Sequence, residues 1–412
     1  MSSDIAVVGG SYGEECAFPR RQVYRGSGGR AAAVISSLGV DVQLHTATGP
    51  HLANIFSSIA NRLNYKLVAV QAATDIWFRY RFPLGRASVY PPFASLTTSV
   101  PNVRADCALV FGMVEGRPVV NARRAVYDPQ DGIQSKHFGE NGSTADELAI
   151  VVSYSEGRAL TGLTDPERIA EALLDQPGTV VAIVKCGPQG ALVRSHKDSG
   201  WVHSFPTRNV YKIGSGDVFS AAFAYGWLLR GMAPIDAAWL ASRMTARYVE
   251  SGVDRFDQAD VEDLLIQSQL AHKKAGQSGP RIVPNKQIYL AGPFFNVAQQ
   301  WLIDEVRGAL RDMGFKVFSP IHDVGEGLAS DIATADLDGL NESSVVLAIL
   351  DGLDPGTVFE VGYARSKSIP VIAVAESVPE NELTMVIGSG CYVTNDLTTG
   401  IYAVCWELMG DA

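Results

Sequence analysis

Short apolar runs alternate with helical patterns along the whole chain, and this alternation limits the available folds more than any other feature. Residues 107–111, 180–185 and 345–350 are apolar runs of strand length. Residues 217–230 and 298–313 have the apolar spacing of helices. Alternating strands and helices predict an α/β protein with mostly parallel sheets, helices on both faces, and ligands bound beyond the carboxyl ends of the strands.

The chain is long enough for more than one domain, because 412 residues exceed the ~150 residues of an ordinary domain. The composition changes over residues 271–286, which contain Lys, Gly, Ser and two prolines without a helical apolar period. Such a stretch is typical of a linker. We therefore predict one domain over residues 1–270, a linker over residues 271–286, and a smaller domain over residues 287–412.

Composition and charge argue against several classes of partner. The chain has 34 basic and 44 acidic residues, a net charge of −10 that does not suit a nucleic-acid polymer. No apolar stretch reaches the ~20 residues of a membrane span, and no signal peptide is visible, so we expect a cytoplasmic protein. The five cysteines are scattered without a C-x-x-C pair, which favours neither a disulfide framework nor a zinc site.

A glycine-rich segment precedes the helical pattern that begins near residue 217. Backbone amides of Gly214, Ser215 and Gly216 can face an anion at a helix N-terminus, where the helix dipole favours negative charge. Asp217 would repel that anion unless it serves as a base that takes a proton from a hydroxyl. A plain glycine turn, with Asp217 satisfying the helix start, explains the same residues.

Six segments of the first domain resemble, in order, the ribokinase-like (PfkB) family of sugar and nucleoside kinases. They are residues 5–10, Gly28-Gly29 with Leu38-Gly39, residues 126–129, Glu156 with residues 160–162, residues 185–191, and residues 214–217. The resemblance implies a ribokinase-like sheet and phosphorylation of a hydroxymethyl group by ATP. It implies Asp217 as base, Gly214 to Gly216 as anion hole, and Mg²⁺ near Glu156. Gly28, Gly29, Arg30 and Gly187 would then line the substrate or cofactor site.

The first domain departs from that family at three places. Arg30 and Ser153 stand where the family usually has Asn, and Tyr211-Lys212 stand where it has Asp-Thr. The segment between Gly10 and Gly28 is short, so we expect a reduced substrate lid. Two functions stay open: a working kinase with an unusual substrate, and a nucleotide-binding regulatory fold without turnover.

Acidic residues gather where the apolar run 345–350 of the second domain ends. Asp351 closes the strand, Asp354 precedes a Pro-Gly turn, and Glu360 is expected in the first turn of a helix that opens near Thr357. Adjacent carboxylates raise one another's pKa, and splitting an acid from a nucleophile is what glycosidic chemistry needs. Alternatively, Thr357-x-x-Glu360 is a capping box and the aspartates are turn residues.

Residues 287–400 resemble the nucleoside 2-deoxyribosyltransferase family, which includes nucleotide N-glycosidases. The matching residues are 288–295, Ser319-Pro320, Asp336, and the run from Asp351 to Ala364. The resemblance implies a smaller Rossmann-like (flavodoxin-like) sheet with no cofactor, in which Glu360 is the nucleophile at the anomeric carbon. By the same resemblance, Asp351 protonates the leaving base, Asp354 fixes the loop, and Tyr289 orients Glu360. The residues expected to shape the pocket are Gly292, Pro293, Phe294, Gly356 and Thr357.

Together these patterns predict cleavage or transfer of an N-glycosidic bond through a glycosyl-Glu360 intermediate, fused to a kinase-like domain. The expected partners are a small nucleoside, nucleotide or sugar and further copies of the chain, a dimer or larger. One alternative is a nucleotide-depleting effector whose first domain senses a ligand or partner. The other is a nucleotide-binding regulator in which neither site turns over.

Overall fold

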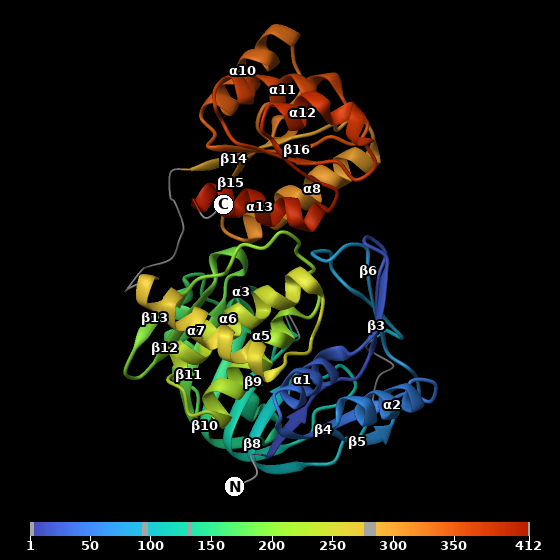
Figure 1. Cartoon of the computed structure of the whole chain (residues 1–412), viewed down its shortest axis with the longest axis vertical. Helices are drawn as coiled ribbons and strands as arrows, with labels where there is room; N and C mark the ends of the chain where they lie inside the picture. Colours follow the sequence, from blue (N-terminus) through green and yellow to red (C-terminus); the bar gives the residue numbers. More distant parts are fainter. Residues whose placement is uncertain (1–3, 93–97, 131–133, 276–285, 411–412) are drawn as a thin grey trace. The chain divides into compact units, whose positions relative to one another are not determined.

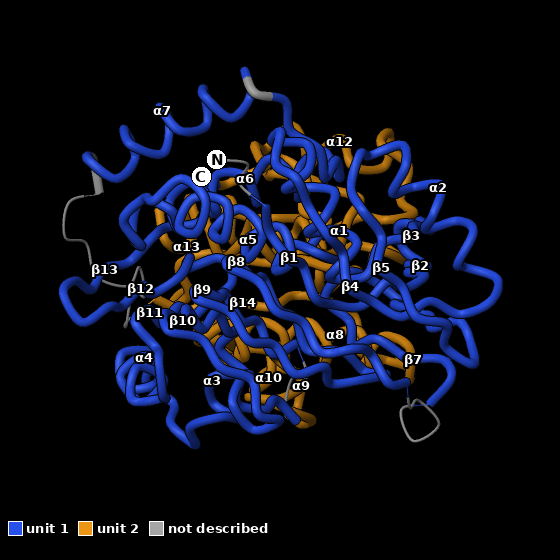
Figure 2. The backbone as a smooth tube through the Cα atoms, turned by 90° about the horizontal axis from the view of Figure 1, so that it is seen from below, with its two compact units in different colours: residues 1–205, 212–280 blue, residues 206–211, 281–412 orange. Residues whose placement is uncertain are grey.

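The computed structural model describes residues 4–92, 98–130, 134–275 and 286–410 (Figure 1). The chain forms two compact units (Figure 2): unit 1 comprises residues 1–205 and 212–280, and unit 2 comprises residues 206–211 and 281–412. Helix α7 (Gln258–Ala275) extends into the predicted linker, and residues 276–285 of that linker lie outside the described residues. Residues 206–211 were not expected in the second unit, where Val210 N donates to Thr399 Oγ1 at 3.0 Å.

A mixed sheet of nine strands forms the centre of unit 1 (Figure 1), in the order β13-β12-β11-β10-β9-β8-β1-β4-β5. All neighbouring pairs from β5 to β11 are parallel, and only the pairs β11–β12 and β12–β13 are antiparallel. The mostly parallel α/β sheet predicted for this domain is confirmed. The strands are β1 (Asp4–Val8), β4 (Asp41–Thr48), β5 (Lys66–Gln71), β8 (Val103–Phe111), β9 (Val120–Asp128), β10 (Thr144–Ser153), β11 (Thr179–Lys185), β12 (Ala191–Ser195) and β13 (Ser199–Val202).

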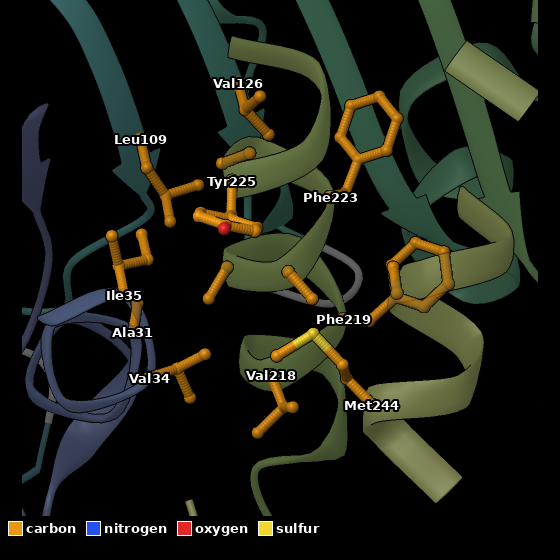
Figure 3. Packing of buried hydrophobic residues seen from close by; sticks show 14 of the residues in the cluster. Ala31, Val34, Ile35, Leu109, Val126, Val218, Phe219, Phe223, Tyr225 and Met244 are labelled. Atoms are coloured by element: carbon orange, nitrogen blue, oxygen red, sulfur yellow. The ribbon is translucent and has the colours of Figure 1, made fainter. Parts of the chain in front are cut away.

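Helices cover both faces of this sheet because alternate strand residues point to opposite faces. Val7 and Leu109 belong to one buried cluster, and their neighbours Val8 and Val110 belong to another. Figure 3 shows α1 and α5 meeting the strands in the first cluster. The helices are α1 (Gly26–Ser37), α2 (Ala53–Leu63), α3 (Tyr154–Thr161), α4 (Pro166–Leu174), α5 (Ser215–Ala224) with its π-helical extension η5 (Tyr225–Leu229), and α6 (Pro234–Ser251).

A second, four-stranded sheet in unit 1 has the order β3-β2-β6-β7. Its strands are β2 (Gly13–Cys16), β3 (Arg21–Tyr24), β6 (Trp77–Tyr80) and β7 (Ser88–Tyr90). The short segment between Gly10 and Gly28 supplies only two of them, and the others come from a later part of the chain. The expectation of a reduced lid considered the length of that segment alone and did not include these later strands, so it stays a prediction.

Unit 2 has a five-stranded parallel sheet in the order β15-β14-β16-β17-β18. This is the flavodoxin-like strand order. The chain adds β15 on one side of β14 and β16 on the other, and such sheets bind ligands at this switch point between β14 and β16. The strands are β14 (Gln287–Ala291), β15 (Lys316–Phe318), β16 (Val345–Ile349), β17 (Val371–Val374) and β18 (Tyr392–Thr394). The helices are α8 (Val297–Asp312), α9 (Pro320–Asp323), α10 (Ala329–Asn341), α11 (Pro355–Ser366), α12 (Thr384–Gly388) and α13 (Leu397–Met409).

Within the described ranges, no helix combines the length and the apolar character that crossing a lipid bilayer would require.

Candidate functional site

The acidic loop of unit 2 begins where β16 ends and leads into α11. Asp354 is the N-cap of this helix: its Oδ2 accepts hydrogen bonds from Thr357 N at 2.8 Å and from Thr357 Oγ1 at 2.9 Å. Pro355 occupies the first helical position, where a missing N–H costs nothing. The helix therefore starts two residues before Thr357, and Glu360 lies beyond the first turn.

Glu360 is held by a neighbouring tyrosine and not by the helix start. Tyr289 Oη, from β14, donates to Glu360 Oε1 at 2.6 Å. The capping-box explanation of Glu360 is wrong, because the amide of Thr357 is satisfied by Asp354. Tyr289 is fully buried and stacks on Phe318, with ring centroids 5.4 Å apart. The phenol is thus fixed in place and defines the position of the carboxylate.

The environment of Glu360 disfavours its charge. Burial raises the pKa of Glu360 to about 7, and repulsion from Asp336 and Asp354 adds to this. The hydrogen bond from Tyr289 acts in the opposite direction, since it stabilises the ionised form. At neutral pH the group is therefore divided between a carboxylate and a carboxylic acid.

Asp336, on α10, is the acidic side chain that reasoning from the residues did not assign a role. Burial raises its pKa, and among the described residues no hydrogen bond reaches its buried Oδ1. It acts electrostatically on both Tyr289 and Glu360, which places it in the same cluster. The only signal in the sequence was its membership in the family resemblance.

Asp351 points to a different partner. Its Oδ2 accepts from Glu376 N at 2.9 Å, and its Oδ1 accepts from Ser377 N at 2.7 Å and from Ser377 Oγ at 2.5 Å. These bonds join the loop after β16 to the loop after β17. Asp354 and Glu360 lie close together as expected, whereas Asp351 turns away. Asp336 is the third acidic residue of the cluster.

The remaining residues predicted for this pocket lie around the same loops. A Cβ added to Gly292 would lie 2.7 Å from Ile303 Cδ1 and 3.2 Å from the Ile349 Cβ, so close packing requires glycine there. Pro293 is buried, Phe294 packs against Phe295 with centroids 5.0 Å apart, and Gly356 lies exposed in the first turn of α11.

The glycine-rich loop of unit 1 leads into α5 as the sequence predicts. Gly214 is the N-cap with φ +81°, a left-handed conformation that favours glycine, and its carbonyl accepts from Val218 N at 3.1 Å. Val218, Phe219 and Phe223 anchor the helix against the sheet and its neighbours (Figure 3). This packing fixes the helix start at which Asp217 lies.

Asp217 is held by two N–H donors. Arg30 Nη1 donates to Asp217 Oδ2 at 2.6 Å, and Gln130 Nε2 donates to Asp217 Oδ1 at 2.7 Å. Arg30 Nη2 donates to Glu14 Oε2, so the guanidinium joins two acids. Burial opposes the charge, yet Glu14, Tyr248 and Asp217 raise the pKa of Arg30 well above its ordinary value. The predicted base is therefore one end of a buried ion-pair network.

Glu156, the predicted metal ligand, satisfies the start of α3. Its Oε2 accepts from Ser153 N at 2.7 Å, while Ser153 Oγ accepts from Glu156 N at 3.3 Å. Burial and the charge of Lys185 lower the pKa of Lys212, and Glu156 opposes this shift. No group of three or more His, Cys, Asp or Glu side chains in the described parts of the chain is placed to hold a metal ion. Because Mg²⁺ is usually held by one or two carboxylates together with the phosphates of a substrate, Glu156 as its ligand stays a prediction.

A second buried pair lies close to the glycine loop. Lys185 Nζ donates to Asp128 Oδ2 at 2.8 Å, and Ser220 Oγ donates to the same oxygen at 2.7 Å. Burial raises the pKa of Asp128 to about 6, although Lys185 opposes this. A Cβ added to Gly216 would lie 3.4 Å from Lys185 Nζ, so this ammonium stands beside the predicted anion hole.

A cavity of about 1280 Å³ opens in unit 1 beside Asp217. Arg30, Gly214 and Asp217 line it, whereas Gly28 packs against the backbone of Gly9. Of the other predicted residues, Gly29 is buried in α1 and Gly187 begins a short 3-10 turn at φ +58°.

Glu115, which also lines this cavity, was not predicted. It is 2% exposed, and Tyr12 Oη donates to its Oε2. Burial raises the pKa of Glu115 to about 7. A single acidic residue following the apolar strand β8 was the available signal.

The solved structures similar to this chain include three kinases. Ribokinase from Thermotoga maritima is 17% identical with a TM-score of 0.46, covering 64% of this chain and 99% of its own. A nucleoside kinase from Methanocaldococcus jannaschii is 14% identical with a TM-score of 0.48, covering 64% and 98%. Phosphofructokinase-2 from Escherichia coli is 13% identical with a TM-score of 0.47, covering 65% and 99%.

Family models match a segment of each unit, whereas no curated protein sequence matches the chain. Residues 148–255 match the pfkB family carbohydrate kinase model, and residues 288–394 match the nucleoside 2-deoxyribosyltransferase model. Both are enzyme families. The two sheets and these matches confirm the predicted fold class, a ribokinase-like α/β domain followed by a smaller parallel-sheet domain. The chain is thus a fusion of a PfkB kinase-like domain with a nucleoside 2-deoxyribosyltransferase-like domain.

Proposed function

We propose that unit 2 cleaves or transfers the N-glycosidic bond of a nucleoside or nucleotide, with Glu360 as the nucleophile. The observation that carries the proposal is the 2.6 Å hydrogen bond that fixes Glu360 against the buried Tyr289. The match of residues 288–394 to the nucleoside 2-deoxyribosyltransferase model supports the same chemistry. Gly292, Pro293, Phe294, Gly356 and Thr357 would shape the pocket around it.

The reaction requires opposite charges to be stabilised at two places. As the bond between the anomeric carbon and the base nitrogen breaks, its electron pair goes to the base and positive charge builds on the sugar ring. The carboxylate of Glu360 stabilises that charge and forms an ester with the anomeric carbon. Water or an acceptor base then attacks this carbon, releases Glu360 and retains the configuration. The acceptor decides between hydrolase and transferase.

We assign protonation of the leaving base to Asp336 and not to Asp351. Burial raises the pKa of Asp336, which favours its protonated form, and its Oδ1 has no hydrogen-bond partner among the described residues. Asp351 accepts three hydrogen bonds that hold two loops together. Asp354 serves the start of α11, as expected for a residue that fixes the loop.

Unit 1 has two candidate functions. In the first, ATP with Mg²⁺ phosphorylates a sugar or nucleoside and Asp217 is the base. In the second, the domain binds a ligand without turnover, as in the nucleotide-depleting effector considered above. The contact between Arg30 and Asp217 favours the second. Consumption of ATP that depends on an added sugar or nucleoside would favour the first.

The test of the main proposal is a panel of nucleosides and their 5′-monophosphates, with the released base separated by chromatography. We expect release by the full chain and a loss of at least about a thousandfold in Glu360→Ala. Glu342→Ala, which removes an exposed glutamate at the end of α10, is the matched control and should retain activity. Mass spectrometry of the quenched reaction should detect the glycosyl ester.

Two results would contradict the proposal. Unchanged base release in Glu360→Ala would show that Glu360 is not the nucleophile. Failure to release a base from any substrate of the panel would show that the chain lacks the proposed activity. The homo-oligomer stays a prediction, which light scattering of the full chain tests.

A further inference from the structure

Three residues that line the cavity of unit 1 carry buried polar atoms to which no other described residue is hydrogen-bonded. The atoms are Arg30 Nε, Ser27 Oγ and Glu115 Oε1, which are buried and have no hydrogen-bond partner among the described residues, while the residues that carry them line the cavity. The three residues are 2%, 6% and 2% exposed. Buried polar groups in folded proteins are nearly always paired. One donor, one hydroxyl and one acceptor on the same cavity therefore indicate a ligand that supplies the missing partners.

The same cavity restricts what Asp217 can do to such a ligand. A general base must come within about 2.6–3.2 Å of the proton that it removes. Both oxygens of Asp217 already accept from N–H donors, and one donor is the cationic Arg30. The guanidinium lies against the glycine loop, since a Cβ on Gly214 would lie 2.3 Å from Arg30 Cζ. A substrate hydroxyl would have to compete with these two donors for the carboxylate of Asp217.

Arg30 is itself anchored on its other side. Glu14 on β2 accepts from Arg30 Nη2 and also from Gly26 N at 3.0 Å, and the guanidinium lies 5.9 Å from the centre of the Tyr248 ring. Moving Arg30 away from Asp217 would leave acidic groups buried without their cation, which is strongly unfavourable. The network therefore favours binding over proton removal.

The rest of the cavity lining indicates the class of ligand. Tyr12 and Phe78 stack with centroids 5.1 Å apart and offer an aromatic wall, which suits a nucleobase. Arg86, Arg117 and Lys136 line the exposed part of the cavity.

Among the described residues, the ion pairs of these three cations involve a single acid. Arg117 and Lys136 share the single carboxylate of Glu140, at 3.9 Å and 4.0 Å, so positive charge remains for a phosphate. The buried acceptor Glu115 and the hydroxyl of Ser27 suit the hydroxyls of a ribose.

We propose that the unit 1 cavity binds a nucleoside 5′-monophosphate and transfers no phosphoryl group to or from it. The base stacks on the aromatic wall, the ribose hydroxyls reach the buried polar atoms, and the phosphate meets the cations at the exposed end. The site is separate from the proposed glycosidic site of unit 2.

The test is calorimetric titration of the full-length Glu360→Ala variant, so that the glycosidic site consumes no probe. AMP should bind at least about tenfold more tightly than adenosine or inorganic phosphate. The double variant Arg86→Ala/Lys136→Ala, on the same background, should lose at least about tenfold of the AMP affinity. Lys197→Ala, which removes an exposed lysine between β12 and β13, is the matched control and should bind AMP normally.

Three outcomes would overturn the proposal. An unchanged AMP affinity in the double variant would mean that AMP binds outside this cavity. Equal affinity for AMP and adenosine would mean that the phosphate contributes nothing to binding. Formation of ADP from ATP that depends on adenosine or AMP in the wild-type chain, and is lost in Asp217→Ala, would show phosphoryl transfer. The base-release assay with the wild-type chain tests the proposed glycosidic activity independently of these three outcomes.

Discussion

Glu360 of unit 2 and Asp217 of unit 1 are both acidic residues near the start of a helix, but their hydrogen-bond donors differ in charge. Glu360 accepts from the neutral phenol of Tyr289, whereas Asp217 accepts from the guanidinium of Arg30. A phenol orients a carboxylate without neutralising it, while a buried guanidinium commits it to an ion pair. The comparison shows that the partner, and not the carboxylate, separates a candidate nucleophile from a structural charge.

The two surroundings differ in what a ligand would find. In unit 2 burial raises the pKa of Glu360, and its acidic neighbours Asp336 and Asp354 raise it further. In unit 1 the neighbours of Asp217 are donors, Arg30 and Gln130, which occupy both of its oxygens. We therefore expect chemistry at the first site and recognition at the second.

After Glu360→Ala, the largest effect should come from Asp336→Asn, which keeps the shape of the side chain but removes the acidic proton. Base release should fall by about 10²–10⁴-fold, the usual contribution of a general acid. A nucleoside of a 7-methylated purine has a base that leaves without protonation, so its release should fall much less. Steady-state rates with both substrates measure the difference.

Asp351→Asn is the comparison for that variant. Because Asp351 joins two loops, its replacement should lower the rates with both substrates by the same factor. If Asp351→Asn shows the dependence on the leaving base and Asp336→Asn does not, the proton donor is Asp351.

Removing the cation from unit 1 should reduce stability. Arg30→Met leaves Glu14 and Asp217 buried without their partner, at a cost of about 3–5 kcal/mol of unfolding free energy. Thermal unfolding of the full chain measures it. The triple variant Arg30→Met/Glu14→Gln/Asp217→Asn should recover much of the loss, because no unpaired charge remains.

Arg123→Ala removes an exposed ion pair with Asp106 and should leave the unfolding temperature unchanged. An equal change of the unfolding temperature in Arg30→Met and Arg123→Ala would mean that the buried network contributes no more to stability than an exposed ion pair. The contrast with the phenol at Glu360 would then lose its energetic basis.

Local patterns predicted much of this molecule. The strand and helix alternation predicted a mostly parallel sheet in each unit, although not the four-stranded sheet, and glycines before an apolar run located the start of α5. The start of α11 was misplaced, although Asp354-Pro355 is a readable signal of a helix N-terminus. Thr357 competed with it because both residue types cap helices.

Contacts between distant side chains could not be predicted from spacing. Arg30 and Asp217 are separated by 187 positions, so nothing local indicates their ion pair. Asp351 stands at a strand end as expected, but its side chain turns to residues 376 and 377 of the next loop. Spacing along the chain fixes which residues reach a sheet edge, and packing decides the direction of each side chain.

The smallest effect should come from Tyr289→Phe, which keeps the ring and removes only the hydroxyl. Losing one hydrogen bond to a carboxylate corresponds to about tenfold in the rate of base release. The pH profile should also move. Activity requires the ionised form of Glu360, whose pKa is about 7, so the rate should rise with pH through this range.

The direction of that movement tests the role given to the phenol. The hydrogen bond lowers the pKa of Glu360, so its removal should raise this pKa and shift the rising limb of the profile to higher pH. Tyr363→Phe, which removes a hydroxyl that is hydrogen-bonded to Asn341, is the matched control and should leave the limb in place. A limb that does not move in Tyr289→Phe would mean that the phenol only fills space, and Glu360 would then have no more defined a partner than an ordinary surface carboxylate.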